Sequence, residues 1–230
     1  MNESTTHDSR LATHEQIHEI LKQNWGYDSF RPLQEQIINS VLQGNDTLAL
    51  MPTGGGKSIC YQIPGLAKNG LCLVISPLIA LMKDQVENLR RKNITAYAIF
   101  SGMSRKEVIN TLKVAAQSNC KFLYVSPERL ETSLFKEYLP ALDINLIAVD
   151  EAHCISQWGY DFRPSYLKIA NLREEVPEVP MLTLRAHSFT ISFACFFVPT
   201  NKIFLPARAI CFIAAAASCS DSTVLLRSMM

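Results

Sequence analysis

The sequence lacks the cysteine spacing of a zinc centre or a disulfide framework. Its seven cysteines, an odd number, include no C-x-x-C pair, whereas zinc and disulfide frameworks place cysteines at short paired spacings. They are Cys60, Cys72, Cys120, Cys154, Cys195, Cys211 and Cys219. We therefore expect reduced thiols, as in a cytoplasmic protein, and no zinc site.

The chain also lacks a charge excess and an apolar start. Its net charge is +1, so any contact with nucleic acid must come from a local patch rather than a basic surface. Residues 1–10 are polar, which excludes a signal peptide or a membrane span there. An apolar content of 48% with 19% charged residues is typical of a folded soluble protein. We expect residues 1–12 to be a disordered N-terminus.

Glycine and acidic residues are missing from the end of the chain. All nine glycines lie at or before Gly159, and residues 185–230 contain Asp221 as their one acidic residue. This stretch is apolar at 28 of 46 positions without a period of 2 or 3.6, and its interruptions leave no run of ~20 residues for a membrane span. We expect an irregular, aberrant apolar tail rather than a native domain, as a shifted reading frame near codon 184 would produce.

Residues 13–184 alternate between helix and strand patterns. Thr13 with Gln16, and Ser104 with Glu107, match the capping box of a helix start. Apolar strand-like runs occupy 47–51, 71–75, 96–100, 122–125, 146–149 and 181–184, and helix-like runs occupy 31–42, 57–68, 78–92, 104–116, 129–139 and 166–175. This order predicts an α/β domain with a mainly parallel sheet covered by helices on both faces. Ligands of such sheets bind beyond the carboxyl ends of the strands.

A glycine-rich loop follows the first strand-like run. It reads Met51-Pro-Thr-Gly-Gly-Gly-Lys-Ser58 and opens a helix-like stretch. Thr53 and Gly54, Gly55 and Gly56 would let backbone N–H groups face phosphates, Lys57 would reach the β- and γ-phosphates, and Ser58 would bind Mg²⁺. Met51 stands where the strict phosphate-loop pattern has its first glycine. The alternative is a glycine-rich turn followed by Lys-Ser by chance.

A second motif, the acidic Asp150-Glu-Ala-His153, directly follows the strand-like run 146–149. Asp150 would hold Mg²⁺, and Glu151 would polarise the attacking water of a nucleoside triphosphatase. Carboxylates that follow a strand are commonly just exposed to water. The motif therefore indicates a nucleotide site only because the chain also carries the phosphate loop. His153 has two interpretations: a relay between nucleotide and DNA, or a hydrogen bond within the sheet edge.

The segment 154–164 is rich in aromatic residues. It carries Trp158, Tyr160 and Phe162, followed by Arg163. Aromatic rings and an arginine on a loop suit stacking against single-stranded bases. Aromatic residues also commonly pack beneath loops, so both interpretations stay open on these residues alone.

Five segments together resemble the RecQ family of DNA helicases in order and spacing. They are 26–34, 51–58, 76–85, 125–130 and 150–164, and the resemblance runs from about Thr13 to Leu184. It implies the first RecA-like domain of a superfamily 2, DEAH-type, ATP-dependent 3′-to-5′ DNA helicase that acts in recombination and repair. The resemblance implies a cytoplasmic location, with association to the nucleoid if the protein is bacterial, and no membrane partner.

The resemblance also assigns roles to individual residues. It implies that Gln34 contacts the adenine edge and that Tyr27 and Arg31 sandwich the ring, in a site for ATP and Mg²⁺. It further implies contacts to single-stranded or duplex DNA. Those contacts would come from Ser76, Pro77, Gln157, Trp158, Phe162 and Arg163.

The chain departs from the family after Leu184. It reads Arg185-Ala-His187 where the family continues with a Thr/Ala-rich motif. We therefore expect no second RecA-like domain, no arginine finger and no family zinc site, and thus weak hydrolysis without unwinding. The alternative is a non-catalytic nucleotide- or DNA-binding regulatory fragment. A phosphate-loop kinase or GTPase is disfavoured, because Asp-Glu-Ala-His has no place in one.

Overall fold

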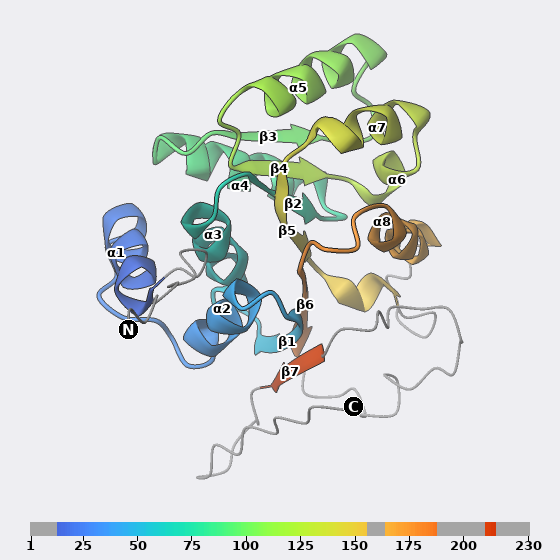
Figure 1. The fold of residues 1–230 in the computed structure, drawn as a ribbon. Helices are drawn as coiled ribbons and strands as arrows, with labels where there is room; N and C mark the ends of the chain where they lie inside the picture. Colours follow the sequence, from blue (N-terminus) through green and yellow to red (C-terminus); the bar gives the residue numbers. More distant parts are fainter. Residues whose placement is uncertain (1–12, 156–163, 188–209, 215–230) are drawn as a thin grey trace, which may run out of the picture.

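A parallel seven-stranded sheet runs through the centre of the computed structural model (Figure 1). The structure describes residues 13–155, 164–187 and 210–214. The strand order is β3-β4-β2-β5-β6-β1-β7, and every neighbouring pair is parallel. The strands are β1 (Asp46–Pro52), β2 (Leu71–Ile75), β3 (Ala96–Ile99), β4 (Phe122–Val125), β5 (Ile144–Val149), β6 (Met181–His187) and β7 (Ile210–Ala214). The α/β class expected from the sequence is confirmed.

Helices connect the successive strands from β1 to β6 and cover both faces of the sheet (Figure 1). The α-helices are α1 (His14–Trp25), α2 (Gln34–Leu42), α3 (Lys57–Ala67), α4 (Ile79–Arg91), α5 (Arg105–Gln117), α6 (Pro127–Leu130), α7 (Ser133–Tyr138) and α8 (Ile169–Glu175). Short 3₁₀ turns lie at Leu139–Ala141, Ala152–Ile155 and Pro164–Lys168. No helix in the described part of the chain is long and apolar enough to cross a membrane.

Alternate residues of the central strands pack into two separate cores, one on each face of the sheet. In β2, Leu73 packs into the core formed with α5, α7 and α8, while Val74 packs into the core formed with α2, α3 and α4. Successive side chains of a strand point to opposite faces. A strand buried on both faces is therefore apolar throughout, and the five residues of β2 are all buried.

A third, smaller core holds α1 against α2 and α3. Ile17 and Leu21 of α1 are fully or almost fully buried there, with Ile38 and Ile63 as neighbours. Thr13 caps α1, because its side chain accepts a hydrogen bond from the Gln16 backbone N–H. α1 packs mainly on α3, and its histidines reach Glu35 in the first turn of α2.

Three expected helices differ from those in the structure. The helix expected over 31–42 begins at Gln34, because Leu33 adopts a left-handed conformation with φ of 72° and breaks the pattern. The helix expected over 129–139 is divided into α6 and α7, since Thr132 leaves the helix and caps α7. The one expected over 166–175 begins as a 3₁₀ turn and becomes α-helical at Ile169.

The C-terminal stretch is ordered into strands at two places. β6 continues past Leu184 to His187, with Leu50 opposite Arg185 and Pro52 opposite His187. Residues 210–214, which we expected to be irregular, form β7 and pair with β1. β6 and β7 flank β1 on its two sides, so the stretch from 185 onward contributes to the sheet at these residues.

Candidate nucleotide-binding site

The glycine-rich loop lies at the carboxyl end of β1 and opens α3. Gly54 and Gly56 have φ of 77° and 73°, a backbone conformation that residues other than glycine rarely adopt. A Cβ on Gly55 would lie 2.9 Å from the Pro52 carbonyl oxygen, so a larger residue would have to displace the loop backbone. This geometry explains why three glycines stand in a row, and it fits a loop whose backbone approaches phosphates.

Gln34 and Arg31 bind this loop from the side of α2. The Gln34 Nε2 donates to the carbonyl oxygens of Gly55 and Gly56, at 3.2 and 3.1 Å. Its Oε1 accepts from the Arg31 backbone N–H at 2.9 Å. The Arg31 guanidinium donates to the Gly54 carbonyl at 2.6 Å. The amide of Gln34, which is only 3% exposed, is thus occupied by protein groups.

This tether is a role that sequence reasoning missed. Gln34 was expected to contact adenine, a role that stays a prediction and would require its amide to exchange partners. No spacing in the sequence could reveal the tether, because residues 34 and 55 meet only through the packing of α2 on α3. Tyr27, expected to stack on the same base, is 52% exposed and therefore accessible to a ligand.

Lys57 and Glu151 form an ion pair across the site. The Lys57 Nζ lies 3.0 Å from Glu151 Oε1, and the two side chains are 16% and 19% exposed. Charges this shielded interact more strongly than a surface pair does. The phosphate-loop lysine and the acidic motif therefore meet at the same edge of the sheet, as the sequence predicted for the carboxyl ends of β1 and β5.

Asp150 and Glu151 occupy a constrained turn directly after β5. Asp150 is 8% exposed, and its Oδ1 accepts the Glu151 backbone N–H at 2.9 Å. Glu151 has φ of 50°, an unusual value for a residue other than glycine. Backbone strain of this kind is often found where a side chain must be aimed at a ligand.

The oxygen donors fit the metal that a nucleoside triphosphate carries. The Ser58 hydroxyl at the start of α3 and the Asp150 carboxylate are the hard oxygen ligands that Mg²⁺ prefers. Both residues lie at the ends of elements that the core holds in place. Mg²⁺ would be held by Ser58 and Asp150, directly or through water.

Buried polar groups anchor α3 behind the loop. The hydroxyl oxygens of Tyr61 and Tyr124 lie 3.3 Å apart, and the Gln62 amide donates to Gln85 of α4 at 3.1 Å. Burial, and then the neighbouring Tyr124, raise the pKa of Tyr61 well above its ordinary value. A neutral, hydrogen-bonded network therefore connects the helix that carries Lys57 with the helix that follows β2.

The two expected DNA-facing residues that the structure describes are buried. Ser76 and Pro77 follow β2 and are both buried, Ser76 at 2% exposure, whereas Leu78 is 47% exposed. A DNA contact by Ser76 and Pro77 stays a prediction. Gln157, Trp158, Phe162 and Arg163, together with the side chain of His153, lie outside the described residues.

Comparison with known proteins decides the family. The model of the DEAD/DEAH box helicase family matches residues 31–190, which include the phosphate loop and the Asp-Glu-Ala-His motif. The chain belongs to this family. Within it, the chain carries a RecQ-type helicase domain, as the resemblance of its motifs implied.

RecQ-type relatives match over nearly three quarters of the chain. It is 46% identical over 167 residues to the ATP-dependent DNA helicase RecQ of Haemophilus influenzae, covering 73% of this chain and 27% of that protein. It is 45% identical over 171 residues to the probable ATP-dependent DNA helicase RecS of Bacillus subtilis, with coverages of 74% and 34%. The chain thus spans about a third or less of the length of these relatives.

Solved helicase structures share the fold at low sequence identity. A hypothetical ATP-dependent RNA helicase from Sulfolobus tokodaii superposes with a TM-score of 0.56 at 21% identity, covering 76% of this chain and 51% of that one. The helicase domain of Pyrococcus furiosus Hef gives 0.54 at 23%, with coverages of 71% and 34%. These similarities confirm the RecA-like fold of the RecQ-type domain.

Proposed function

We propose that this chain binds ATP with Mg²⁺ at the carboxyl edge of β1 and β5 and provides the ATP-binding half of a RecQ-type DNA helicase. The Lys57–Glu151 contact carries the proposal, because it brings the two motifs of a nucleoside triphosphatase within 3.0 Å. When nucleotide binds, Lys57 would exchange Glu151 for phosphate oxygens. Glu151, so released, would orient and deprotonate water.

When bound, ATP with its metal supplies the γ-phosphoryl group for transfer and the negatively charged phosphates that the loop would bind. Backbone N–H groups of the loop would face the phosphates, and Ser58 and Asp150 would hold the metal. Tyr27 is accessible for stacking on the base, with Arg31 at the loop. Single-stranded DNA would contact the surface beyond β2 and the 154–164 segment, where Trp158, Phe162 and Arg163 lie in the sequence.

We expect this chain alone to hydrolyse ATP slowly and not to unwind DNA. In related phosphoryl-transfer enzymes an arginine finger contributes ~10³–10⁵ in rate, and the described residues make one RecA-like sheet. Strand separation by the purified chain would contradict this part of the proposal.

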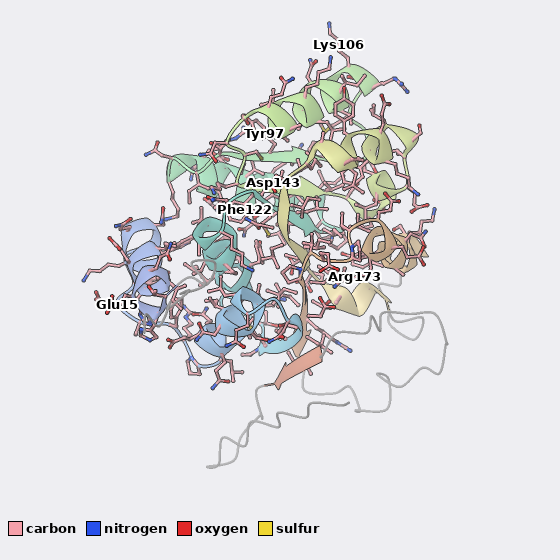
Figure 2. The ribbon with its side chains drawn as sticks, in the orientation of Figure 1. Glu15, Tyr97, Lys106, Phe122, Asp143 and Arg173 are labelled. Carbon is pink, nitrogen blue, oxygen red and sulfur yellow. The ribbon has the colours of Figure 1, made fainter. Side chains whose placement is uncertain are left out.

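A fluorescent ATP analogue provides the test of binding. Lys57→Ala should abolish Mg²⁺-dependent binding and any DNA-stimulated hydrolysis. Lys106→Ala is the matched control, because Lys106 is an exposed lysine on α5, at the opposite end of the molecule (Figure 2). Unchanged binding in Lys57→Ala would overturn the assignment of the site.

The same assay separates the alternatives. Binding of ATP without any turnover sensitive to Lys57→Ala would favour a non-catalytic nucleotide- or DNA-binding regulatory fragment. Preference for GTP over ATP in competition would favour a GTPase. ATP binding with slow, DNA-stimulated turnover that Lys57→Ala abolishes would support the helicase half.

A further inference from the structure

Three side chains outside the nucleotide site converge between α1 and α2. His14 and His18 lie four residues apart on α1, and Glu35 lies in the first turn of α2. The Nε2 atoms of His14 and His18 lie 2.7 and 3.3 Å from the same Glu35 Oε1. One ligand atom from each residue lies within 4.8 Å of the other two, the one such group among the described residues.

Two imidazoles and a carboxylate form a donor set that suits zinc. Zn²⁺ binds imidazole nitrogen and carboxylate oxygen at about 2.0–2.2 Å, usually with four ligands in a tetrahedron. Ligand atoms of such a tetrahedron are about 3.4 Å apart, close to the observed 2.7 and 3.3 Å. All three ligand atoms lie within 4.8 Å of one another, so side-chain shifts of about 1 Å would bring them around one ion.

The supporting helices are already held in place. Thr13 fixes the start of α1 one residue before His14, and Ile17, between the two histidines, is fully buried. The ring of Phe30 packs edge-on against His18, with centroids 4.8 Å apart. The imidazole rings of His14 and His18 are 4.4 Å apart, so a metal would not have to assemble them.

The site is accessible to an ion from solvent. The side chains of His14, His18 and Glu35 are 68%, 28% and 35% exposed. A metal ion could therefore reach the three side chains without any rearrangement of the fold. Water could fill the remaining coordination position.

We propose that His14, His18 and Glu35 bind one Zn²⁺ or another divalent transition ion that prefers imidazole. The cysteine spacing, on which the expectation of no zinc site rested, carries no information about this histidine cluster. The site would connect α1 with the start of α2, where Gln34, the neighbour of Glu35, holds the phosphate loop. It is independent of the Mg²⁺ that accompanies ATP.

Glu15 offers a matched control for the ligand assignment. The helix start His14-Glu-Gln-Ile-His18 has the H-E-x-x-H spacing that puts two histidines on one helix face. Glu15 is exposed on α1 (Figure 2) and is not needed by the proposed site. Glu15→Gln removes the same charge as Glu35→Gln from the neighbourhood of the two histidines.

The experiment uses the full chain, purified without a polyhistidine tag and freed of metal by chelation. Titration with Zn²⁺ in a calorimeter should show a site that His14→Ala, His18→Ala and Glu35→Gln each weaken. The loss should exceed the about 10–100-fold that removal of an outer-shell partner costs, because a ligand itself is removed. Glu15→Gln should retain the affinity of the original chain.

A spectroscopic and a thermal readout keep the test independent of activity. Co²⁺ should produce visible absorption bands that His14→Ala abolishes, and His14 is exposed enough for its replacement to leave the fold intact. Zn²⁺ should raise Tm of the original chain and of Glu15→Gln but not of His18→Ala, because a ligand of the folded state stabilises it.

Two results would overturn the proposal. One is Zn²⁺ binding that none of the three ligand substitutions changes, which would assign the ion to cysteines or other groups. The other is equal competition by Mg²⁺, which would indicate a loose acidic surface instead of an imidazole site.

Discussion

Lys57 and Glu151 are separated by 94 positions in the sequence, yet Lys57 Nζ donates to Glu151 Oε1 across 3.0 Å. The lysine is thereby held where the phosphate loop opens into α3, and the carboxylate is held beside it. Each charge satisfies the other, so each becomes available to a ligand only when the pair separates.

Glu151→Gln should uncouple binding from hydrolysis. The amide can still contact Lys57 but cannot take a proton from water, so turnover should fall by about 10²–10⁴, the usual contribution of a general base. Affinity for ATP should be equal or higher, because Lys57 loses a charged competitor for phosphate. Equilibrium binding and single-turnover hydrolysis measure the two effects separately.

The result that would contradict this role is a Glu151→Gln chain that hydrolyses ATP at the original rate. Glu178→Gln is the control, because Glu178 is an exposed glutamate after α8 that belongs to neither motif. Its substitution should leave both binding and turnover unchanged.

Gln34→Ala should loosen the phosphate loop before any nucleotide is added. The substitution removes two hydrogen bonds to Gly55 and Gly56 and the acceptor of the Arg31 N–H. Buried groups left unpaired cost about 1–3 kcal/mol, so amide hydrogen exchange at 53–57 should accelerate. Measured without nucleotide, this effect cannot come from lost adenine contacts.

Gln36→Ala provides the comparison for the tether. Gln36 is exposed on the same helix, so its loss should leave exchange in the loop unchanged. If Gln34→Ala exchanged no faster than Gln36→Ala, the observed hydrogen bonds would not restrain the loop.

The sequence predicted the buried strands β2 and β4 better than the ends of the helices or the strands β6 and β7. β2 and β4 were expected at their observed bounds, because a strand buried on both faces is a continuous apolar run between polar residues. The start of α2 was expected three residues too early. Leu33 is left-handed, with φ of 72°, a backbone conformation that hydrophobic periodicity does not register.

The site shows the same division. That Lys57 meets the Asp150–Glu151 motif could be predicted, because motifs at the carboxyl ends of parallel strands converge on one edge; their roles with nucleotide stay a prediction. The Gln34 tether and the His14–Glu35 contact could not be predicted. Both depend on how α1, α2 and α3 pack on one another, and nothing in the spacing of these residues specifies that packing.

Buried thiols should resist alkylation in the folded chain. Burial raises the pKa of Cys60 from an ordinary 9.0 to about 12 and that of Cys120 to about 11, and raises that of Cys72 well above its ordinary value. The reactive form is the thiolate. Brief labelling at pH 8 followed by peptide mapping should therefore leave these three cysteines unmodified, and labelling in denaturant should modify all of them.

The same shifts make the fold sensitive to alkali. A thiol whose pKa is higher in the folded state stabilises it fully below the unfolded value, and this contribution is lost as pH rises through the folded value. For Cys60 that window lies between 9.0 and about 12. Cys60→Ala should therefore flatten the fall of stability with pH above 9, measured by urea unfolding. If the free energy of unfolding of Cys60→Ala fell with pH as steeply as that of the original chain, Cys60 would not be the cause of the alkali sensitivity.

Arg173 of α8, labelled in Figure 2, and Asp46 at the start of β1 form the most buried ion pair among the described residues, at 12% and 9% side-chain exposure. Asp46 Oδ1 also accepts the Met181 backbone N–H at 2.8 Å, so one carboxylate joins β1, β6 and α8. Arg173→Ala would leave that carboxylate buried without its cation. Removing one partner of a buried pair typically costs about 3–5 kcal/mol.

The matched comparison is Lys22→Ala, which removes an exposed pair. Lys22 Nζ lies 3.0 Å from Asp28 Oδ1, with side chains 72% and 83% exposed, and such pairs contribute about 0–1 kcal/mol. Urea unfolding should therefore separate Arg173→Ala from Lys22→Ala by several kcal/mol. Adding Asp46→Asn to Arg173→Ala should recover part of the loss, because a neutral amide oxygen still accepts the Met181 N–H. Equal stability of the two single variants would show that Arg173 is solvated in solution and that Asp46 does not depend on it.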